Sequence, residues 1–222
     1  MSPAPFRSST GQNPLKLFSK LCLPQIALAA AAPQAWALLP ADLPRCPPKP
    51  VQCIAISLWL SPQTAATDWL RGQISQANER LSPIGAAIQV TEIHDLVPTA
   101  ITRVAQRNAL GQRGAQTPLR WFVVDSLRDA QNPKELRKGV TWRQNQQFWI
   151  IEATSAMPWV FAHELGHVLG LPHSKEAASI MNKTPRLWPP PNKIGFTPKE
   201  LPTMRRTLKR LLLQKRLLLQ RS

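Results

Sequence analysis

The chain has 222 residues, 43% of them apolar, with eight tryptophans, six phenylalanines and no tyrosine. This length allows one sizeable domain but not a second of ordinary size, and the apolar fraction excludes wholesale disorder. The net charge of +16 favours anionic surfaces, acidic substrates or nucleic acid as nonspecific partners without choosing among them. No specific nucleic-acid binding is therefore expected.

Residues 1–37 have the pattern of a secretory signal peptide. A basic stretch precedes an apolar run at residues 21–32, and residues 35–37 (AWA) form a small-x-small cleavage site. An uncleaved membrane anchor would need about 20 apolar residues, and this run is shorter and is interrupted by Pro24. We therefore expect cleavage after Ala37 and secretion to an extracellular or periplasmic location.

A proline-rich linker is expected at residues 38–50. Cleavage of the leader would remove Cys22 and leave Cys46 and Cys53 as an even pair. In an oxidising compartment such a pair can form a disulfide, with a free thiol as the alternative.

Strands and helices are then expected to alternate along the chain. Residues 51–60 (VQCIAISLWL) are almost continuously apolar and predict a strand buried on both faces. Near-helical spacing of apolar residues predicts a helix over 62–81. Residues 87–93 and 119–124 are the next strands, with a short helix around 99–109 between them.

Two short strands follow at residues 138–142 and 147–151, and their close spacing favours antiparallel pairing at a sheet edge. A helix is expected at residues 157–169, capped by Thr154 or Ser155. This order predicts an α/β (α+β) fold in which a twisted mixed sheet with an antiparallel edge strand packs on helices. A last helix is expected after Thr197-Pro-Lys-Glu, which resembles a capping box.

Three of the four histidines of the chain lie on the helix expected at 157–169 or just after it. His163 and His167 are spaced i and i+4, so both imidazoles can face one metal ion. Glu164 lies about 100° around the helix from His163 and sits beside the metal without binding it. Gly170 can end the helix in a left-handed turn, which delivers His173 as a third ligand.

Three protein ligands leave one zinc coordination position open, which is typical of a catalytic site. Glu164 is placed to act as general base and then general acid in hydrolysis. The short pattern HExxH also occurs by chance. Its extension to H-E-x-x-H-x-x-G-x-x-H favours one catalytic zinc ion.

The sequence HELGHVLGLPH at residues 163–173 resembles the zinc signature of metzincin metallopeptidases. Ser179-Ile-Met-Asn resembles their Met-turn, in which Met181 would support the site from below. Ser174 directly after the last histidine resembles the matrixins among them. The resemblance implies a metzincin-like catalytic domain at residues 51–212 and a zinc-dependent metalloendopeptidase that hydrolyses proteins or peptides.

The resemblance also implies where a substrate would lie. Residues 138–142 would be the edge strand on which an extended peptide adds antiparallel, and residues 182–196 would wall the pocket beside the scissile bond. Only His94 precedes the motif, so a second histidine-bound zinc is excluded. Calcium stays open, because Asp125, Asp129 and Glu135 are too scattered to predict a site.

Pro44-Arg-Cys46 resembles the start of the matrixin cysteine switch, in which a thiolate blocks the zinc. The residues that follow differ from that motif, and too few residues precede Cys46 after cleavage to form a folded propeptide. We therefore rank this role below a disulfide or a free thiol.

The sequence KRLLLQ occurs twice, at residues 209–214 and 215–220. A period of six does not match a helix, so some leucines fall off the apolar face. Residues 213–222 are expected to be the solvated basic end of a docked helix, or a segment that contacts an anionic membrane or partner.

Three other classes of function remain open. They are a catalytically silent zinc-binding protein, a surface-binding protein that acts through the basic tail, and a zinc hydrolase of small molecules. The intact Glu164 favours the peptidase over the silent protein.

Overall fold

The computed structural model describes residues 38–47, 51–60, 67–96, 99–114, 117–145, 147–184 and 188–220. The predicted signal peptide and the first residues of the helix predicted at 62–81 lie outside these ranges. Within the ranges, no helix is both long enough and apolar enough to cross a bilayer.

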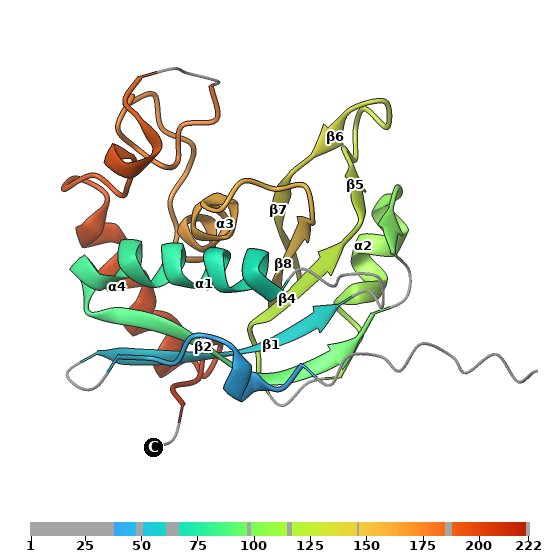
Figure 1. Cartoon of the computed structure of the whole chain (residues 1–222), viewed down its shortest axis with the longest axis horizontal. Helices are drawn as coiled ribbons and strands as arrows, with labels where there is room; N and C mark the ends of the chain where they lie inside the picture. The colour runs from blue at the N-terminus through green and yellow to red at the C-terminus, as the bar shows by residue number, and fades with distance from the viewer. Residues whose placement is uncertain are drawn as a thin grey trace, which may run out of the picture. The chain divides into compact units, whose positions relative to one another are not determined.

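A five-stranded mixed sheet forms the centre of the domain, in the order β2-β1-β4-β8-β7 (Figure 1). The first four strands are parallel, and β7 pairs antiparallel with β8 at the edge. Buried apolar strands and one half-exposed edge are what the sequence pattern predicts. The strands are β1 (Gln52–Leu60), β2 (Ala86–Asp95), β4 (Arg120–Val124), β7 (Gly139–Gln144) and β8 (Gln147–Ala153).

Three helices cover one face of the sheet: α1 (Thr67–Leu81), α3 (Val160–Val168) and α4 (Leu201–Leu213). Their buried residues, such as Ile74, Leu165 and Leu208, join one core cluster with residues of β1 and β2. α1 packs against α3, and Figure 1 shows both on one side of the sheet, above β1 and β2 and to the left of β7 and β8.

A second apolar cluster covers the opposite face, around Phe122, Trp149 and Leu110. Leu110 belongs to α2 (Val104–Leu110). A small sheet of β3 (Ala100–Ile101), β5 (Ser126–Arg128) and β6 (Leu136–Arg137) adjoins it in the order β3-β5-β6. The sequence does not predict this sheet, because its strands are two or three residues long and carry no visible alternation.

The predicted fold class is confirmed, but two helices begin later than expected. α2 begins at Val104 rather than near residue 99, because Ala100 and Ile101 belong to β3. α3 begins at Val160, with Trp159 at the N-cap position and no side-chain cap. Thr154 is not a cap because its N–H extends the sheet by donating to the Val124 carbonyl at 2.9 Å. The chain then turns before the helix starts.

The end of the chain also differs from the expectation. α4 closes with Lys215 in the left-handed region (φ 53°), and residues 217–220 then lie along β1. Ala55 N–H donates to the Leu218 carbonyl (2.9 Å) and Gln220 N–H to the Cys53 carbonyl (2.7 Å). β4 pairs only with residues 57–60 of β1, so the first half of β1 has free backbone groups that the tail satisfies. The expectation that residues 213–222 form only a solvated end is therefore wrong for residues 217–220, which pair with β1.

Short turns complete the domain. Cys46 and Cys53 form a disulfide, with their Cα atoms 6.0 Å apart, which fastens the proline-rich segment to the start of β1. The 3-10 turns are η1 (Pro40–Asp42), η2 (Ser82–Ile84) and η3 (Pro191–Lys193).

Candidate metal centre

α3 ends in a turn that only a few residue types adopt easily. Gly170 has a φ of +88°, its N–H donates to the His167 carbonyl (3.0 Å), and Leu171 N–H donates to the Gly166 carbonyl (2.9 Å). These two bonds are the hydrogen-bond pattern of a Schellman turn with glycine in the left-handed position. The turn reverses the chain and places His173 beside the helix.

The three histidines of the motif lie together. One candidate ligand atom from each of His163, His167 and His173 lies within 4.8 Å of the other two. The ring centroids are 4.9 Å apart for His163 and His167, and 4.8 Å apart for His167 and His173. Within the described ranges, this is the one cluster of at least three histidine, cysteine or acidic side chains with the spacing to hold a metal ion.

Backbone carbonyls orient two of the imidazoles. His163 Nδ1 lies 2.7 Å from the Ile180 carbonyl, and His167 Nδ1 lies 2.8 Å from the Leu171 carbonyl. A carbonyl only accepts hydrogen bonds, so each Nδ1 carries the proton and donates, and Nε2 keeps its lone pair. This tautomer presents Nε2 as a zinc ligand, so the donor set fits zinc.

Burial keeps the imidazoles neutral. It lowers the pKa of His163 to about 4, although the hydrogen bond to the Ile180 carbonyl acts in the opposite direction. Burial also lowers the pKa of His167 and, together with the neighbouring His167, that of His173. A neutral imidazole is the form that binds a metal, so the three side chains are ready to bind one at neutral pH.

Glu164 faces β7 and is only 5% exposed. Thr141 Oγ1 lies 2.8 Å from Glu164 Oε2 and 2.8 Å from the Glu164 backbone carbonyl. Burial raises the pKa of Glu164 to about 7, against the effect of the Thr141 hydrogen bonds. A carboxyl that titrates near neutral pH can both accept and return a proton.

β7 approaches α3 closely at Gly139. A Cβ added there would lie 2.6 Å from Val160 Cγ1 and 2.9 Å from Glu164 Oε1, so a larger residue would push the edge strand away from the helix. The missing side chain thus sets the spacing between the edge strand and the carboxylate.

Met181 packs against α3 and is fully buried. Gly166 packs against Met181 Sδ and the Phe196 ring so closely that a Cβ would overlap both. Ser179 Oγ accepts the Met181 N–H (3.0 Å) and donates to Glu200 Oε1 (2.7 Å). The Met-turn is therefore held from α3 on one side and from the start of α4 on the other.

A second buried carboxyl, Glu152 in β8, was not predicted as a functional residue. Trp121 Nε1–H donates to its Oε2 (3.0 Å), and the Trp121 ring stacks on Phe161 of α3 (3.9 Å). Its Oε1 has no hydrogen-bond partner among the described residues. Burial, and then the charge of Glu164, raise the pKa of Glu152 well above its ordinary value. The only sequence signal is a single acidic residue in the apolar run 148–153.

The segment predicted to wall a pocket, residues 182–196, is closed at its base. Ile180 N–H donates to the Gly195 carbonyl (2.7 Å), and Gly195 N–H donates to the Ala178 carbonyl (3.0 Å). Residues 185–187 lie outside the described ranges.

The structure does not bring the remaining candidate residues into the cluster. His94 lies on β2, stacked on Trp59 at 4.2 Å. Cys46 is bonded to Cys53 and offers no thiolate to a metal. Of the acidic residues considered for calcium, Asp129 accepts a hydrogen bond from Arg137 Nε (2.6 Å).

Comparison with known proteins agrees with this geometry. The matrixin family model matches residues 123–200. The crystal structure of metalloproteinase-II from Bacteroides fragilis is similar at 17% identity and a TM-score of 0.54, over 75% of this chain and 56% of that chain. Archaemetzincin from Methanopyrus kandleri is similar at 14% identity and a TM-score of 0.51, over 73% of this chain and 98% of that chain. No curated protein matches the chain.

These identities are low, so the two structures show the fold. The present chain spans little more than half of the Bacteroides fragilis protein. Together with the matrixin match, they confirm the resemblance that the histidine motif indicates, and the fold is metzincin-like.

Proposed function

We propose that this protein is a secreted zinc-dependent metalloendopeptidase. His163, His167 and His173 bind one zinc ion, and Glu164 is the catalytic acid and base. The observation that carries the proposal is the cluster of three imidazoles that lie within ligand distance of one another. The helix α3 also carries Glu164, next to His163 in the chain, and the buried carboxyl of Glu164 has a pKa raised to about 7.

Each residue of the site has a distinct role in the proposed reaction. When bound, zinc polarises the scissile carbonyl and makes water a stronger nucleophile at neutral pH. Glu164 accepts the proton of the attacking water and passes it to the leaving amine. Thr141 holds the Glu164 carboxylate through Oε2 at 2.8 Å, and the Ile180 and Leu171 carbonyls hold two of the imidazoles.

The substrate lies along β7. Among the described strands, β7 pairs on one side with β8 and has no neighbour on the other, so its outer backbone groups can bind an extended peptide. Such a peptide runs antiparallel to β7 and passes its backbone beside Glu164. An open edge of this kind favours a peptidase over a zinc hydrolase of small molecules.

Secretion follows from the leader pattern at residues 1–37. The Cys46–Cys53 disulfide supports it, since disulfides persist in oxidising compartments. Mass analysis of the protein recovered outside the cell tests this part, and a mature N-terminus other than Leu38 would correct the cleavage site.

The experiment that tests the proposal is cleavage of an unfolded protein substrate by the purified protein. We expect cleavage that stops with a zinc chelator and returns when zinc is added back. Peptide products mapped by mass spectrometry should show internal cuts, which define an endopeptidase.

A pair of histidine substitutions separates this activity from that of a contaminant. His167→Ala should remove both zinc and cleavage, whereas His94→Ala, which changes the histidine outside the cluster, should remove neither. Cleavage that survives His167→Ala would show that the activity belongs elsewhere.

One observation favours a second role, contact with an anionic surface. Leu213, Leu218 and Leu219 are exposed at 76%, 38% and 43%, within a basic stretch. Co-sedimentation with anionic lipid vesicles tests this role by comparing the wild type with Leu213→Ser, which leaves the pairing of residues 217–220 in place. Equal binding of the two proteins to the vesicles would show that Leu213 does not contribute to membrane contact.

A further inference from the structure

A cavity of about 320 Å³ joins the candidate metal centre to a group of arginines. Thr141 and His167 of the centre line it, and so do Arg143, Arg210 and Arg216. These arginines come from β7, from α4 and from the residues after α4, which are three separate parts of the chain. The folded domain therefore gathers positive charge beside the site.

No carboxylate of the described residues lies within ion-pair distance of any of these three arginines. Arg216 is fixed above the Phe148 ring, 5.1 Å from its centroid. Burial, and then repulsion from Arg143 and Arg210, lower the pKa of its guanidinium. Like charges kept close together without a counterion are costly unless a ligand supplies the negative charge.

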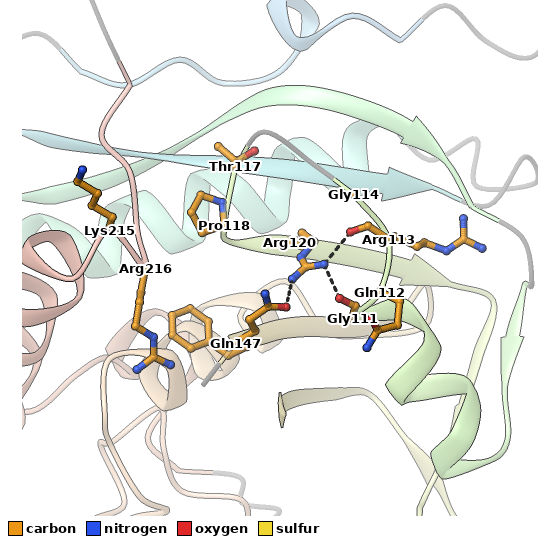
Figure 2. Close-up of a pocket in the computed structure, with 11 residues that line it drawn as sticks. Gly111, Gln112, Arg113, Gly114, Thr117, Pro118, Arg120, Gln147, Lys215 and Arg216 are labelled. Atoms are coloured by element: carbon orange, nitrogen blue, oxygen red, sulfur yellow. Dashed lines mark hydrogen bonds between the residues drawn. The ribbon is translucent and has the colours of Figure 1, made fainter. Parts of the chain in front are cut away.

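The positive charge continues into a larger adjoining cavity of about 560 Å³, which shares Phe148 and Arg216 with the first. Figure 2 shows Lys215 and Arg216 on one side of it and Arg120 between Gln147 and the 111–113 backbone. Arg120 donates to the carbonyls of Gly111 (2.8 Å) and Arg113 (2.7 Å) and to Gln147 Oε1 (2.9 Å). These acceptors are all neutral, so none of them compensates the charge of the buried guanidinium next to the cavity.

The orientation of β7 indicates which part of a substrate meets this charge. Alternate residues of a strand face the same side, so Arg143 faces the same side as Thr141, whose hydroxyl contacts Glu164. A peptide antiparallel to β7 runs from Arg143 towards Gly139. Arg143 and its neighbours therefore contact residues on the N-terminal side of the scissile bond.

We infer that the basic groove formed by Arg143, Arg210 and Arg216 binds acidic side chains of the substrate on the N-terminal side of the scissile bond. This inference rests on the proposed peptidase function and deepens it by naming a substrate class. The peptidase selects extended segments that carry Asp or Glu before the cleaved bond.

Matched peptides test the preference. One peptide carries three glutamates before a single cleavable bond, the second carries three glutamines there, and the third carries the glutamates after the bond. We expect kcat/KM for the first to exceed that for the second by roughly tenfold, the effect of one charge-assisted hydrogen bond, and the third to gain nothing. A general attraction to the +16 chain would favour the third peptide as well, and that result would overturn the inference.

The double variant Arg143→Gln/Arg210→Gln locates the effect. Both side chains are exposed, so folding is not at stake, and the ratio of kcat/KM between the first and second peptides should fall towards one. Lys209→Gln is the matched control: it removes one charge from the same helix and lies outside the residues that line the groove, so the ratio should persist.

The result also separates this inference from the proposed function. If no peptide is cut, the peptidase function itself fails. If the glutamate and glutamine peptides are cut equally well by the wild type, or if the double variant keeps the preference, the peptidase stands and the acidic subsite is wrong.

Discussion

At the scale of a single residue, the backbone conformation of Gly170 shapes the candidate metal centre. Its φ of +88° ends α3, and the next residue supplies the carbonyl that orients His167. A side chain at this position meets both backbone strain and the Thr207 side chain, which would lie 2.9 Å from an added Cβ.

Gly170→Ala should therefore lower the free energy of unfolding by about 1–2 kcal/mol and weaken zinc affinity, as measured by thermal unfolding and zinc titration. Gly85→Ala is the control, since Gly85 also has a positive φ (69°) but nothing within 4 Å of an added Cβ. Gly85→Ala should lower the free energy of unfolding but leave the zinc affinity unchanged. Equal zinc affinities in the two variants would contradict the role given to Gly170.

Glu152 gives the stability of the protein a pH dependence. Burial raises the folded-state pKa above the unfolded value of 4.5, so between these two values the folded state binds more protons than the unfolded state. Its contribution to stability is fully present below pH 4.5 and is lost as the pH rises through the folded pKa.

Glu152→Gln removes this titration and keeps an acceptor for Trp121 Nε1–H. The free energy of unfolding of the variant relative to wild type should rise steadily as the pH increases above 4.5, as measured by urea titration at several pH values. A difference that does not change with pH would show that Glu152 ionises in the folded protein as it does in the unfolded chain.

At the scale of elements, the contact between the edge strand β7 and the helix α3 positions the catalytic carboxyl. β7 brings Thr141 to Glu164, and Gly139 allows the two elements to touch. Neither residue stands out in the sequence, because their roles depend on a contact between segments more than twenty residues apart.

Thr141→Val keeps the shape of the side chain and removes its hydroxyl. We expect kcat to fall by about 10-fold to 100-fold, the usual range for a residue that orients a catalytic group at a metal site, with zinc content unchanged. Thr141→Ser should restore most of the activity. If valine and serine are equally active, the hydroxyl does not position Glu164.

The C-terminal segment is the second element with a testable role. Leu217 is buried, and Leu218 and Gln220 pair with β1. A chain ending at Arg216 loses about 1.5–3 kcal/mol from apolar burial and about 1 kcal/mol for each of two backbone hydrogen bonds. Its melting temperature should fall well below that of a chain ending at Gln220, and equal melting temperatures would mean that the pairing contributes nothing.

At the scale of the whole molecule, local sequence patterns predicted the features that are set by residue spacing within one segment. Continuous apolar runs predicted the central strands, and the i, i+4 histidines with Gly170 predicted the group of three imidazoles. Contacts between distant segments were not predictable in this way. They include the pairing of residues 217–220 with β1, the burial of Glu152 and the gathering of Arg143, Arg210 and Arg216.

The proposed hydrolysis depends on one catalytic carboxylate beside a zinc held by three histidines. The most direct test is the cleavage rate of Glu164→Gln at the same zinc content as wild type, since glutamine keeps the size of the side chain and the contact with Thr141 but accepts no proton. We expect a loss of at least about 100-fold in kcat. A variant that holds zinc and cuts peptides at the wild-type rate would contradict this mechanism.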